Sequence, residues 1–391
     1  MVKKEIYANK TFLILIFSLL LFGLFIIYNA TAYFSQATFG SPFRFVILQL
    51  VWIASGLITF LIFSNIDYRK LKTISFLLFV ASLFFLLILA FVGAFFCKGP
   101  DDTGTLFAPC INGASRWFYF NPKPLPEIPF FGVLGLQPSE LAKFSIILYL
   151  SFQLNKFGQK KTSGNDPFVV YIVTAIAFSV LLLLQPNMST AVLVFLIASA
   201  IYFVSDNSLV PLIISAPIVG LLGFLSILTS DYRKARFLTL LGVVPETELE
   251  AGYHIKQVMI ALGSGGFFGV GFGQSRQKYQ YLPEVASDSI FAIIGEEFGF
   301  MGTTAVILMF GYLMYLGLSI AKRAPDVLGR MLASGITLWI GFQFFINVAA
   351  MTKLIPLTGM PIPLISYGGS SMIFTLAGLG GLRSIQKQVK A

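Results

Sequence analysis

The sequence predicts an all-α integral membrane protein with about ten transmembrane helices. Of its 391 residues, 57% are hydrophobic and only 11% are charged, whereas a soluble domain usually carries about 25% charged residues. Its apolar runs are about 20 residues long, which suits a membrane-spanning helix, while barrel strands are about 10 residues long and alternate in polarity. A soluble protein with a very large core would still need charged residues on its surface.

Ten apolar segments are expected to cross the membrane. The first resembles a signal peptide, but it is too long and no small-residue cleavage site follows it, so we expect an uncleaved span. No soluble domain boundary stands out, so residues 1–391 are treated as one polytopic membrane domain. The approximate segments are 12–30, 44–64, 74–96, 138–154, 167–185, 188–205, 209–228, 288–320, 330–352 and 362–382.

The net charge of +10 is distributed over short loops, which indicates membrane topology rather than nucleic-acid binding. Loops rich in Lys and Arg stay on the cytoplasmic side. The pattern therefore predicts cytoplasmic termini and two long extracellular loops, at about 97–137 and 229–287. The cytoplasmic clusters are Lys3, Lys4 and Lys10; Arg69, Lys70 and Lys72; Lys156, Lys160 and Lys161; Lys322, Arg323 and Arg330; and Arg383, Lys387 and Lys390.

Both cysteines, Cys97 and Cys110, fall in the first outer loop. The space outside the membrane is oxidising in many cells, so a disulfide is one expectation, and two unpaired thiols are the other.

Several kinds of site find no support. The only histidine is His254, beside a membrane loop, so a Ser–His–Asp catalytic triad is not credible. The two cysteines do not make a zinc site. The glycines between 263 and 273 resemble a nucleotide loop, but no βαβ unit surrounds them. They favour close helix approach or a re-entrant segment instead.

Carboxylates at the end of the second outer loop are the leading candidates. Pro283 makes Glu284 the expected helix start, where the helix dipole favours a negative charge. Asp288 lies where the loop enters the membrane, and a carboxylate there is costly unless it is used or paired. Alternatively, Ser287 or Asp288 caps a helix that begins at Ser289. Residue chemistry alone leaves both interpretations of Asp288 open.

A second candidate is the motif LQPSELAKF, residues 136–144. Glu140 and Lys143 are spaced i, i+3 in an otherwise apolar helix, so their side chains meet on one face. Charged residues within a span are paired and often functional. A structural ion pair that locks two helices is the alternative.

The outer loops also carry groups suited to a phosphate next to a sugar. Arg116 offers a forked guanidinium and Trp117 a flat face for stacking, although an aromatic belt at the interface has the same composition. Further outer cations suit a lipid pyrophosphate or anionic headgroups. They are Arg233, Lys234, Arg236, Arg276 and Lys278.

The segment 355–372, IPLTGMPIPLISYGGSSM, contains three prolines and paired glycines before the last span. This composition predicts a broken helix entry. Irregular backbone at that depth should line a cavity or be buried by protein.

Six motifs spread over most of the chain are GASRW at 113–117, QPSELAK at 137–143, QPNMSTA at 185–191, ALGSGGFFGVGFGQSRQKYQYLPE at 261–284, FAIIGEEFGFMG at 291–302 after Asp288, and PLISYGGSSM at 363–372. In this order they resemble the SEDS family (shape, elongation, division and sporulation), and they are somewhat more FtsW-like than RodA-like.

The resemblance implies a peptidoglycan glycosyltransferase that polymerises lipid II outside the bacterial cytoplasmic membrane, in cell division or elongation. It also implies a class B penicillin-binding protein as partner, with other division or elongation proteins. It places the family's essential aspartate at Asp288, its tryptophan at Trp117 and its intramembrane pair at Glu140 and Lys143. The remaining candidates for substrate binding are Arg116, Arg233, Arg236, Glu284, Lys353 and Ser366.

Three positions depart from the family's pattern. Ala286-Ser287 replaces the usual His-Thr before the aspartate, Asn187 replaces an acid, and Thr358 replaces a lysine for which Lys353 could substitute. Asp288 is expected to act as general base on the acceptor hydroxyl. Cations, or a divalent cation (Mg²⁺ or Mn²⁺) without assignable ligands, would stabilise the leaving pyrophosphate. A lipid II flippase and a non-catalytic division scaffold are the alternatives.

Overall fold

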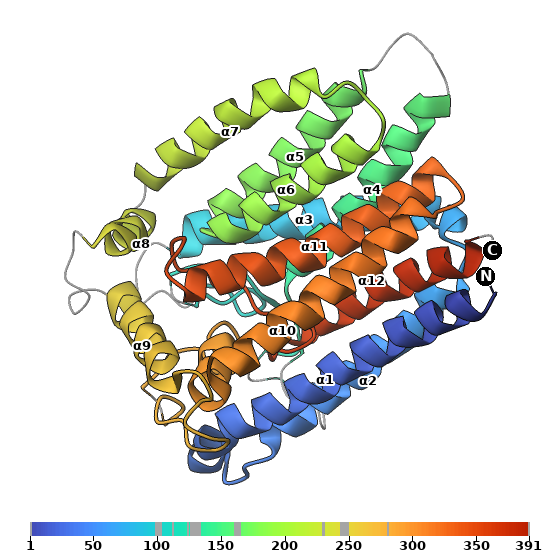
Figure 1. The fold of residues 1–391 in the computed structure, drawn as a ribbon. Helices are drawn as coiled ribbons and strands as arrows, with labels where there is room; N and C mark the ends of the chain where they lie inside the picture. Colours follow the sequence, from blue (N-terminus) through green and yellow to red (C-terminus); the bar gives the residue numbers. More distant parts are fainter. Residues whose placement is uncertain are drawn as a thin grey trace.

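The computed structural model describes residues 2–97, 104–111, 113–122, 125, 134–159, 166–228, 231–242, 250–279 and 281–389. These residues form a helical bundle with one two-stranded ribbon (Figure 1). The elements are α1 (Val2–Phe39), α2 (Arg44–Asn65), η1 (Tyr68–Leu71), α3 (Lys72–Phe96), β1 (Phe118–Tyr119), β2 (Gly135–Leu136), α4 (Pro138–Gln159), α5 (Pro167–Leu184), α6 (Met188–Val204), α7 (Val210–Leu228), α8 (Asp231–Leu241), α9 (Glu250–Gly265), α10 (Ile290–Lys322), α11 (Val327–Met351) and α12 (Gly369–Gln388).

Each of the ten predicted segments coincides with a helix. Six helical segments of the described chain are individually long and apolar enough to cross a membrane, and α6 is apolar but shorter. The chain is therefore a multi-pass membrane protein. Its two termini lie at the same end of the bundle (Figure 1). The cations Lys160, Lys161 and Lys390 lie outside the described residues.

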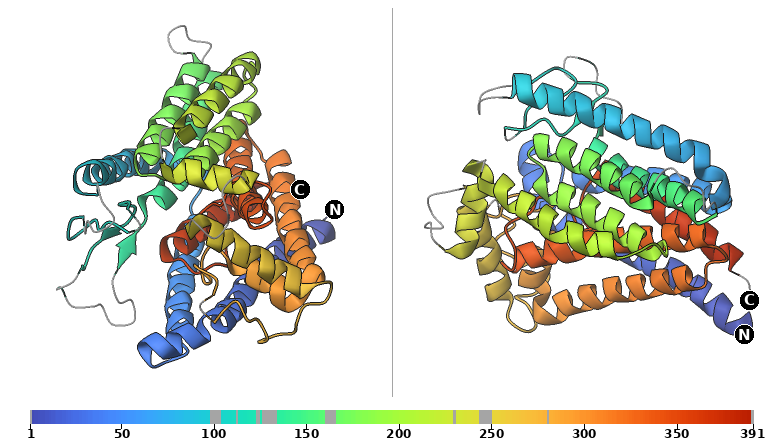
Figure 2. Two further views of the ribbon diagram at one scale, coloured as in Figure 1. Left: turned by 90° about the vertical axis from the view of Figure 1, so that its left-hand side faces the viewer. Right: turned by 90° about the horizontal axis from the view of Figure 1, so that it is seen from above.

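The segment predicted as the second outer loop, about 229–287, contains two helices that were not predicted, α8 and α9. These helices lie across the end of the bundle opposite the termini (Figure 2). Both are short, and α8 has a polar composition, so a search for long apolar runs does not detect them.

Several helix boundaries differ from the prediction. The first helix continues to Phe39, and the last begins at Gly369 rather than 362 because Pro361 and Pro363 disfavour helical backbone before them. The expectation that Glu284 starts a helix is wrong: its φ is 50°, in a turn, and α10 begins only at Ile290.

The centre of the bundle is formed by α4 and α11, most of whose side chains are buried. Small residues allow the outer helices to approach closely. On α2 and α12, a Cβ at Gly56 would lie 2.5 Å from the Leu376 side chain, and one at Gly380 would lie 2.5 Å from the Phe60 carbonyl oxygen. Such small-residue contacts are typical of helix packing in membranes.

The first outer loop is tied to the bundle. Cys97 at the end of α3 forms a disulfide with Cys110, with Cα atoms 5.8 Å apart, so the disulfide expectation is confirmed. Strands β1 and β2 pair antiparallel, Phe118 opposite Leu136 and Tyr119 opposite Gly135. This pairing places Trp117 immediately before one strand and the start of α4 just after the other.

Helix α10 is broken at Gly299, whose φ is 64°. The amides of Val270 and Gly271 donate to the carbonyls of Glu296 and Glu297 that the break leaves free, at 2.9 and 3.1 Å. In return, the Phe300 and Met301 amides donate to the carbonyls of residues 266 and 267. The glycine-rich run therefore packs against a broken helix.

This close approach explains the glycines. A Cβ at Gly265 would overlap the carbonyl oxygen of Gly295, and one at Gly269 would overlap that of Glu297. The expectation of close backbone approach in place of a nucleotide loop is confirmed.

Candidate active site

Asp288 lies in the turn between residues 283 and 289, and its backbone is fixed from the opposite side. Three consecutive carbonyls of this turn accept hydrogen bonds: Ala286 from the Tyr367 amide at 2.8 Å, Ser287 from the Ser366 hydroxyl at 2.6 Å, and Asp288 from the Asn347 amide group at 2.8 Å. The donors come from α11 and from the segment before α12. The turn therefore has one position relative to the core.

The helix-cap interpretation of Asp288 is wrong. The N-cap of α10 is Ser289, and no side chain caps the helix there. No residue in the described part of the chain donates a hydrogen bond to the Asp288 carboxylate. Its oxygens are therefore available to a substrate hydroxyl.

The environment of Asp288 favours its protonated form. Burial, and then the negative charge of Glu284, raise the pKa of Asp288 to about 7, although the positive charges of Arg236 and Arg116 oppose this shift. A carboxyl group that titrates near neutral pH suits a general base, because it is both ionised and basic enough to take a proton.

Gly359 borders the same carboxylate. A Cβ on this residue would lie 3.1 Å from Oδ2 of Asp288, which is closer than an ordinary van der Waals contact. The neighbouring Thr358, where the family often has lysine, is buried, and its hydroxyl has no hydrogen-bond partner among the described residues.

Three arginines near this turn donate hydrogen bonds to backbone carbonyls, and two of them also act electrostatically on Asp288. Arg236 on α8 donates to the Leu357 carbonyl at 2.7 Å, and Arg116 donates to the Pro186 carbonyl at 2.8 Å; both act electrostatically on Asp288. Arg233 donates to the Leu183 carbonyl at 2.9 Å, at the end of α5, and burial lowers its pKa. The cations that act on the charge of Asp288 are Arg236 and Arg116. Lys353 lines one hollow with Arg236.

Glu284 and Ser287 form a local pair beside Asp288. The Ser287 hydroxyl donates to the Glu284 carboxylate at 2.8 Å, while the amides of Ser287 and Ser289 donate to the Glu284 carbonyl. The departure at Ala286-Ser287 therefore leaves the turn intact, since these two residues are held through their carbonyls.

The predicted pair on α4 forms. Lys143 Nζ lies 2.7 Å from the Glu140 carboxylate and 2.7 Å from Oε1 of Gln343, and all three side chains are buried. Lys143 also lies over the Trp339 ring, 5.5 Å from its centroid. The ion pair lies within α4, and the hydrogen bond from Lys143 to Gln343 joins it to α11. Substrate binding by Glu140 and Lys143 stays a prediction.

Trp117 is half-buried and lies against β2, where a Cβ at Gly135 would be 3.3 Å from its ring. The other departure, Asn187, accepts a hydrogen bond from the Thr190 amide and caps α6. A neutral cap explains this position without a charge.

The sequence interpretation set His254 aside, but the fold brings it to the turn. Its Nε2 lies 2.6 Å from Oγ of Ser289, and Oγ lies 2.9 Å from the Pro283 carbonyl oxygen. A carbonyl only accepts, so the hydroxyl proton goes to Pro283 and His254 must donate its Nε2–H. Burial, and then Arg236, lower the pKa of His254 to about 4, so the imidazole is neutral at neutral pH.

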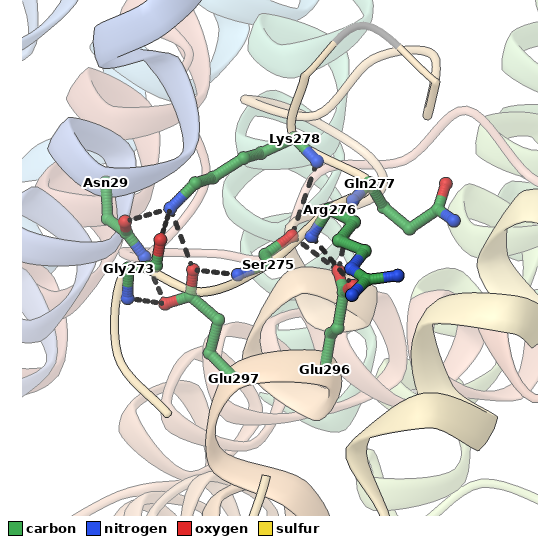
Figure 3. A network of polar contacts seen from close by, with 8 residues as sticks. All are labelled: Asn29, Gly273, Ser275, Arg276, Gln277, Lys278, Glu296 and Glu297. Carbon is green, nitrogen blue, oxygen red and sulfur yellow. Dashed lines mark hydrogen bonds and ion pairs between the residues drawn. The ribbon is translucent and has the colours of Figure 1, made fainter. Parts of the chain in front are cut away.

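Glu296 and Glu297 do not face Asp288. They bind the loop 273–278 (Figure 3). Glu297 accepts from the Gly273 amide at 3.1 Å, from Lys278 Nζ at 3.1 Å and from Asn29 of α1, and Glu296 accepts from the Arg276 amide at 3.0 Å and from the Ser275 hydroxyl. These two acids hold the loop 273–278, so the acids at the turn itself are Glu284 and Asp288.

Asn347, Gln343, His254 and Gly359 were not predicted. Gln343 and Asn347 had a signal, since two amides spaced i, i+4 in an apolar span are expected to hydrogen-bond across helices. The others had none, because only the folded chain brings them to Asp288.

No group of three or more His, Cys, Asp and Glu side chains able to hold a metal ion converges among the described residues. The residues described do not build a cage for Mg²⁺ or Mn²⁺, and we assign no step to such an ion.

Comparison with known proteins identifies the family. The FtsW/RodA/SpoVE model, described as cell cycle protein, matches residues 10–391. Stage V sporulation protein E of Bacillus subtilis (strain 168) is 32% identical over 388 residues, 99% of each chain. A probable peptidoglycan glycosyltransferase FtsW of Geobacter sp. (strain M18) is 33% identical over 370 residues, 94% of each chain.

Solved structures show the same fold. The crystal structure of the Thermus thermophilus rod shape determining protein RodA superposes with a TM-score of 0.66 at 23% identity, over 97% of both chains. A chain of a peptidoglycan synthase complex gives a TM-score of 0.73 at 23% identity, over 96% of this chain and 97% of that one. The chain belongs to the FtsW/RodA/SpoVE family of cell cycle proteins, which is the family that the sequence motifs predicted.

Proposed function

We propose that this protein is a peptidoglycan glycosyltransferase that polymerises lipid II into glycan strands on the outer face of the bacterial cytoplasmic membrane, for division or elongation. One observation supports it most: Asp288 has a pKa of about 7 and a carboxylate that accepts no hydrogen bond from the described residues, and its turn is held by three backbone hydrogen bonds. Several relatives carry the name "Probable peptidoglycan glycosyltransferase FtsW".

In the proposed reaction, a hydroxyl of the acceptor GlcNAc attacks the anomeric carbon of the donor, which bears the lipid pyrophosphate. Asp288 takes the hydroxyl proton as the new C–O bond forms. The bond to the pyrophosphate breaks, and its electron pair stays on the phosphate oxygen. One displacement inverts an α-linked donor into a β-linked polymer. A positioned base typically contributes about 10²–10⁴-fold.

The cations beside the turn suit the leaving group. Arg116 and Arg236 act electrostatically on the same site as Asp288, so they are placed to offset negative charge that develops on the pyrophosphate. Trp117 offers its ring to a sugar. Glu140, Lys143, Arg233, Glu284 and Lys353 stay proposed substrate contacts, while Ser366 acts through the Ser287 carbonyl. Chelator titration during polymerisation tests whether Mg²⁺ or Mn²⁺ is required.

We also propose a class B penicillin-binding protein as partner, which would cross-link the strands. Its support is the shared fold with a chain from a complex that coordinates polymerisation and crosslinking. Cytoplasmic termini would place the turn outside the cell, because the turn and the termini belong to opposite ends of the bundle.

The test is polymerisation of purified lipid II by the protein with its partner. We expect wild-type chains and no chains with Asp288→Asn. Normal chain formation by Asp288→Asn would end the assignment of the base. Transport of lipid II across vesicles without polymerisation would instead support a flippase. The absence of both polymerisation and transport would support a scaffold.

A further inference from the structure

Two buried amide side chains connect the Asp288 turn to the intramembrane ion pair. Gln343 and Asn347 are 0% exposed and lie one turn apart on α11. Gln343 Nε2 donates to the Pro361 carbonyl at 2.8 Å, and Asn347 Nδ2 donates to the next carbonyl back, Met360, at 2.7 Å. Together they hold the segment that carries Gly359.

The orientation of Gln343 is dictated by its partners. Its Oε1 accepts from Lys143 Nζ at 2.7 Å and from Trp339 Nε1 at 3.0 Å, and both of these groups can only donate. The Pro361 carbonyl can only accept, so it requires the NH₂ group. Gln343 therefore accepts a hydrogen bond from the Lys143 ammonium group through Oε1 and donates one to the Pro361 carbonyl through Nε2.

Asn347 is oriented in the same way. Its Nδ2 lies between two carbonyl oxygens, those of Asp288 at 2.8 Å and Met360 at 2.7 Å. Its Oδ1 is buried and has no hydrogen-bond partner among the described residues. An unsatisfied buried acceptor lowers stability, which partly offsets the two hydrogen bonds that Nδ2 donates.

We propose that Asn347 and Gln343 are positioning residues for glycosyl transfer, which set the place of the Asp288 turn relative to Lys143. The inference rests on the proposed function and deepens it. Hydrogen bonds run from the Glu140–Lys143 pair through Gln343 to Pro361, and from Met360 through Asn347 to Asp288. Asp288 and Lys143 are therefore both held by side chains of α11 that lie one turn apart.

The sharpest variant is Asn347→Asp, which keeps the size but turns the donor into an acceptor facing two carbonyls. Because a misplacement of about 1 Å can cost about 10²-fold in rate, we expect kcat for lipid II polymerisation to fall about 100-fold. Binding of lipid II should stay within about threefold. The matched control is Asn207→Asp, which makes the same substitution in the loop after α6. This variant should polymerise lipid II normally.

One further readout separates positioning from support of the fold. The acid limb of the pH–rate profile of Asn347→Ala should move to lower pH. A looser turn exposes Asp288 to water, while Glu284, Arg236 and Arg116 still face it.

The outcomes are distinct. If Asn347→Asp fails to fold, Asn347→Ser retains one donor and should show an intermediate kcat with the same shift of the acid limb. An unchanged acid limb would show a purely structural role and overturn the inference. If Asp288→Asn were active, the assignment of Asp288 as the base would fail. The positioning role of Asn347 would still be judged by the kcat of Asn347→Asp.

Discussion

Gly359 leaves the space that the carboxylate of Asp288 occupies. A Cβ at Gly359 would sit 3.1 Å from Oδ2 of Asp288. The segment before α12 thus limits where the acid can go, in addition to anchoring its backbone.

Gly359→Ala should therefore impair polymerisation by displacing the carboxylate by a few tenths of an ångström. We expect kcat to fall about tenfold with lipid II binding retained, since placement matters more to the transition state than to binding. Gly311→Ala is the matched control, because a Cβ at Gly311 on α10 meets nothing within 4 Å. Equal rates for the two variants would contradict this reading of Gly359.

The pH–rate profile should report Asp288. Since its pKa is raised to about 7, activity should rise with pH through that value as the base ionises. Glu284→Gln removes a charge that raises the pKa of Asp288, so the acid limb should move to lower pH. Arg236→Gln removes an opposing charge, so the limb should move to higher pH, in each case by about one unit or less. Shifts in the same direction would rule out Asp288 as the titrating group.

Asp288→Asn should abolish activity and yet stabilise the protein above neutral pH. The folded-state pKa of about 7 exceeds the ordinary value of 3.8, so the folded state binds the proton more tightly. The stability that this proton contributes is present at low pH and is lost as pH rises toward and through the folded-state value. Thermal unfolding should show a larger gain in melting temperature for Asp288→Asn at pH 8 than at pH 5. A lower melting temperature at pH 8 would indicate that the carboxylate serves the fold.

His254→Gln should keep most activity and leave the acid limb unchanged. The pKa of His254 is lowered to about 4, so the imidazole does not titrate near neutral pH, and a glutamine amide can still donate to Ser289. His254→Ala loses this hydrogen bond, which should lower the free energy of unfolding by about 1 kcal/mol. Loss of the acid limb in His254→Gln would identify the imidazole as the base instead.

The sequence predicts the scaffold of this site better than its contacts. Long apolar runs locate all ten segments because the membrane demands length, and the i, i+3 spacing predicts the Glu140–Lys143 pair because a helix fixes that geometry. The choice of Asp288 as the base required the family resemblance, because the local sequence is equally compatible with a helix cap.

The remaining features depend on long-range contacts. The wrong helix start at Glu284 came from a local proline rule, whereas the observed turn depends on Tyr367, Ser366 and Asn347, which are remote in sequence. Helix α9, and with it the contact of His254 with Ser289, could not be read from hydrophobicity.

The break at Gly299 divides α10 into two segments with different neighbours. The short segment after Asp288 is bonded to the glycine run and to the loop 273–278, while the long segment after Gly299 has many side chains facing outward. When the bilayer changes thickness, a long helix adjusts its tilt. Because the backbone ladder is interrupted at Gly299, we expect the long segment to change its tilt more than the Asp288 turn does. The hydrogen bonds of Phe300 and Met301 to the glycine run form the joint between them.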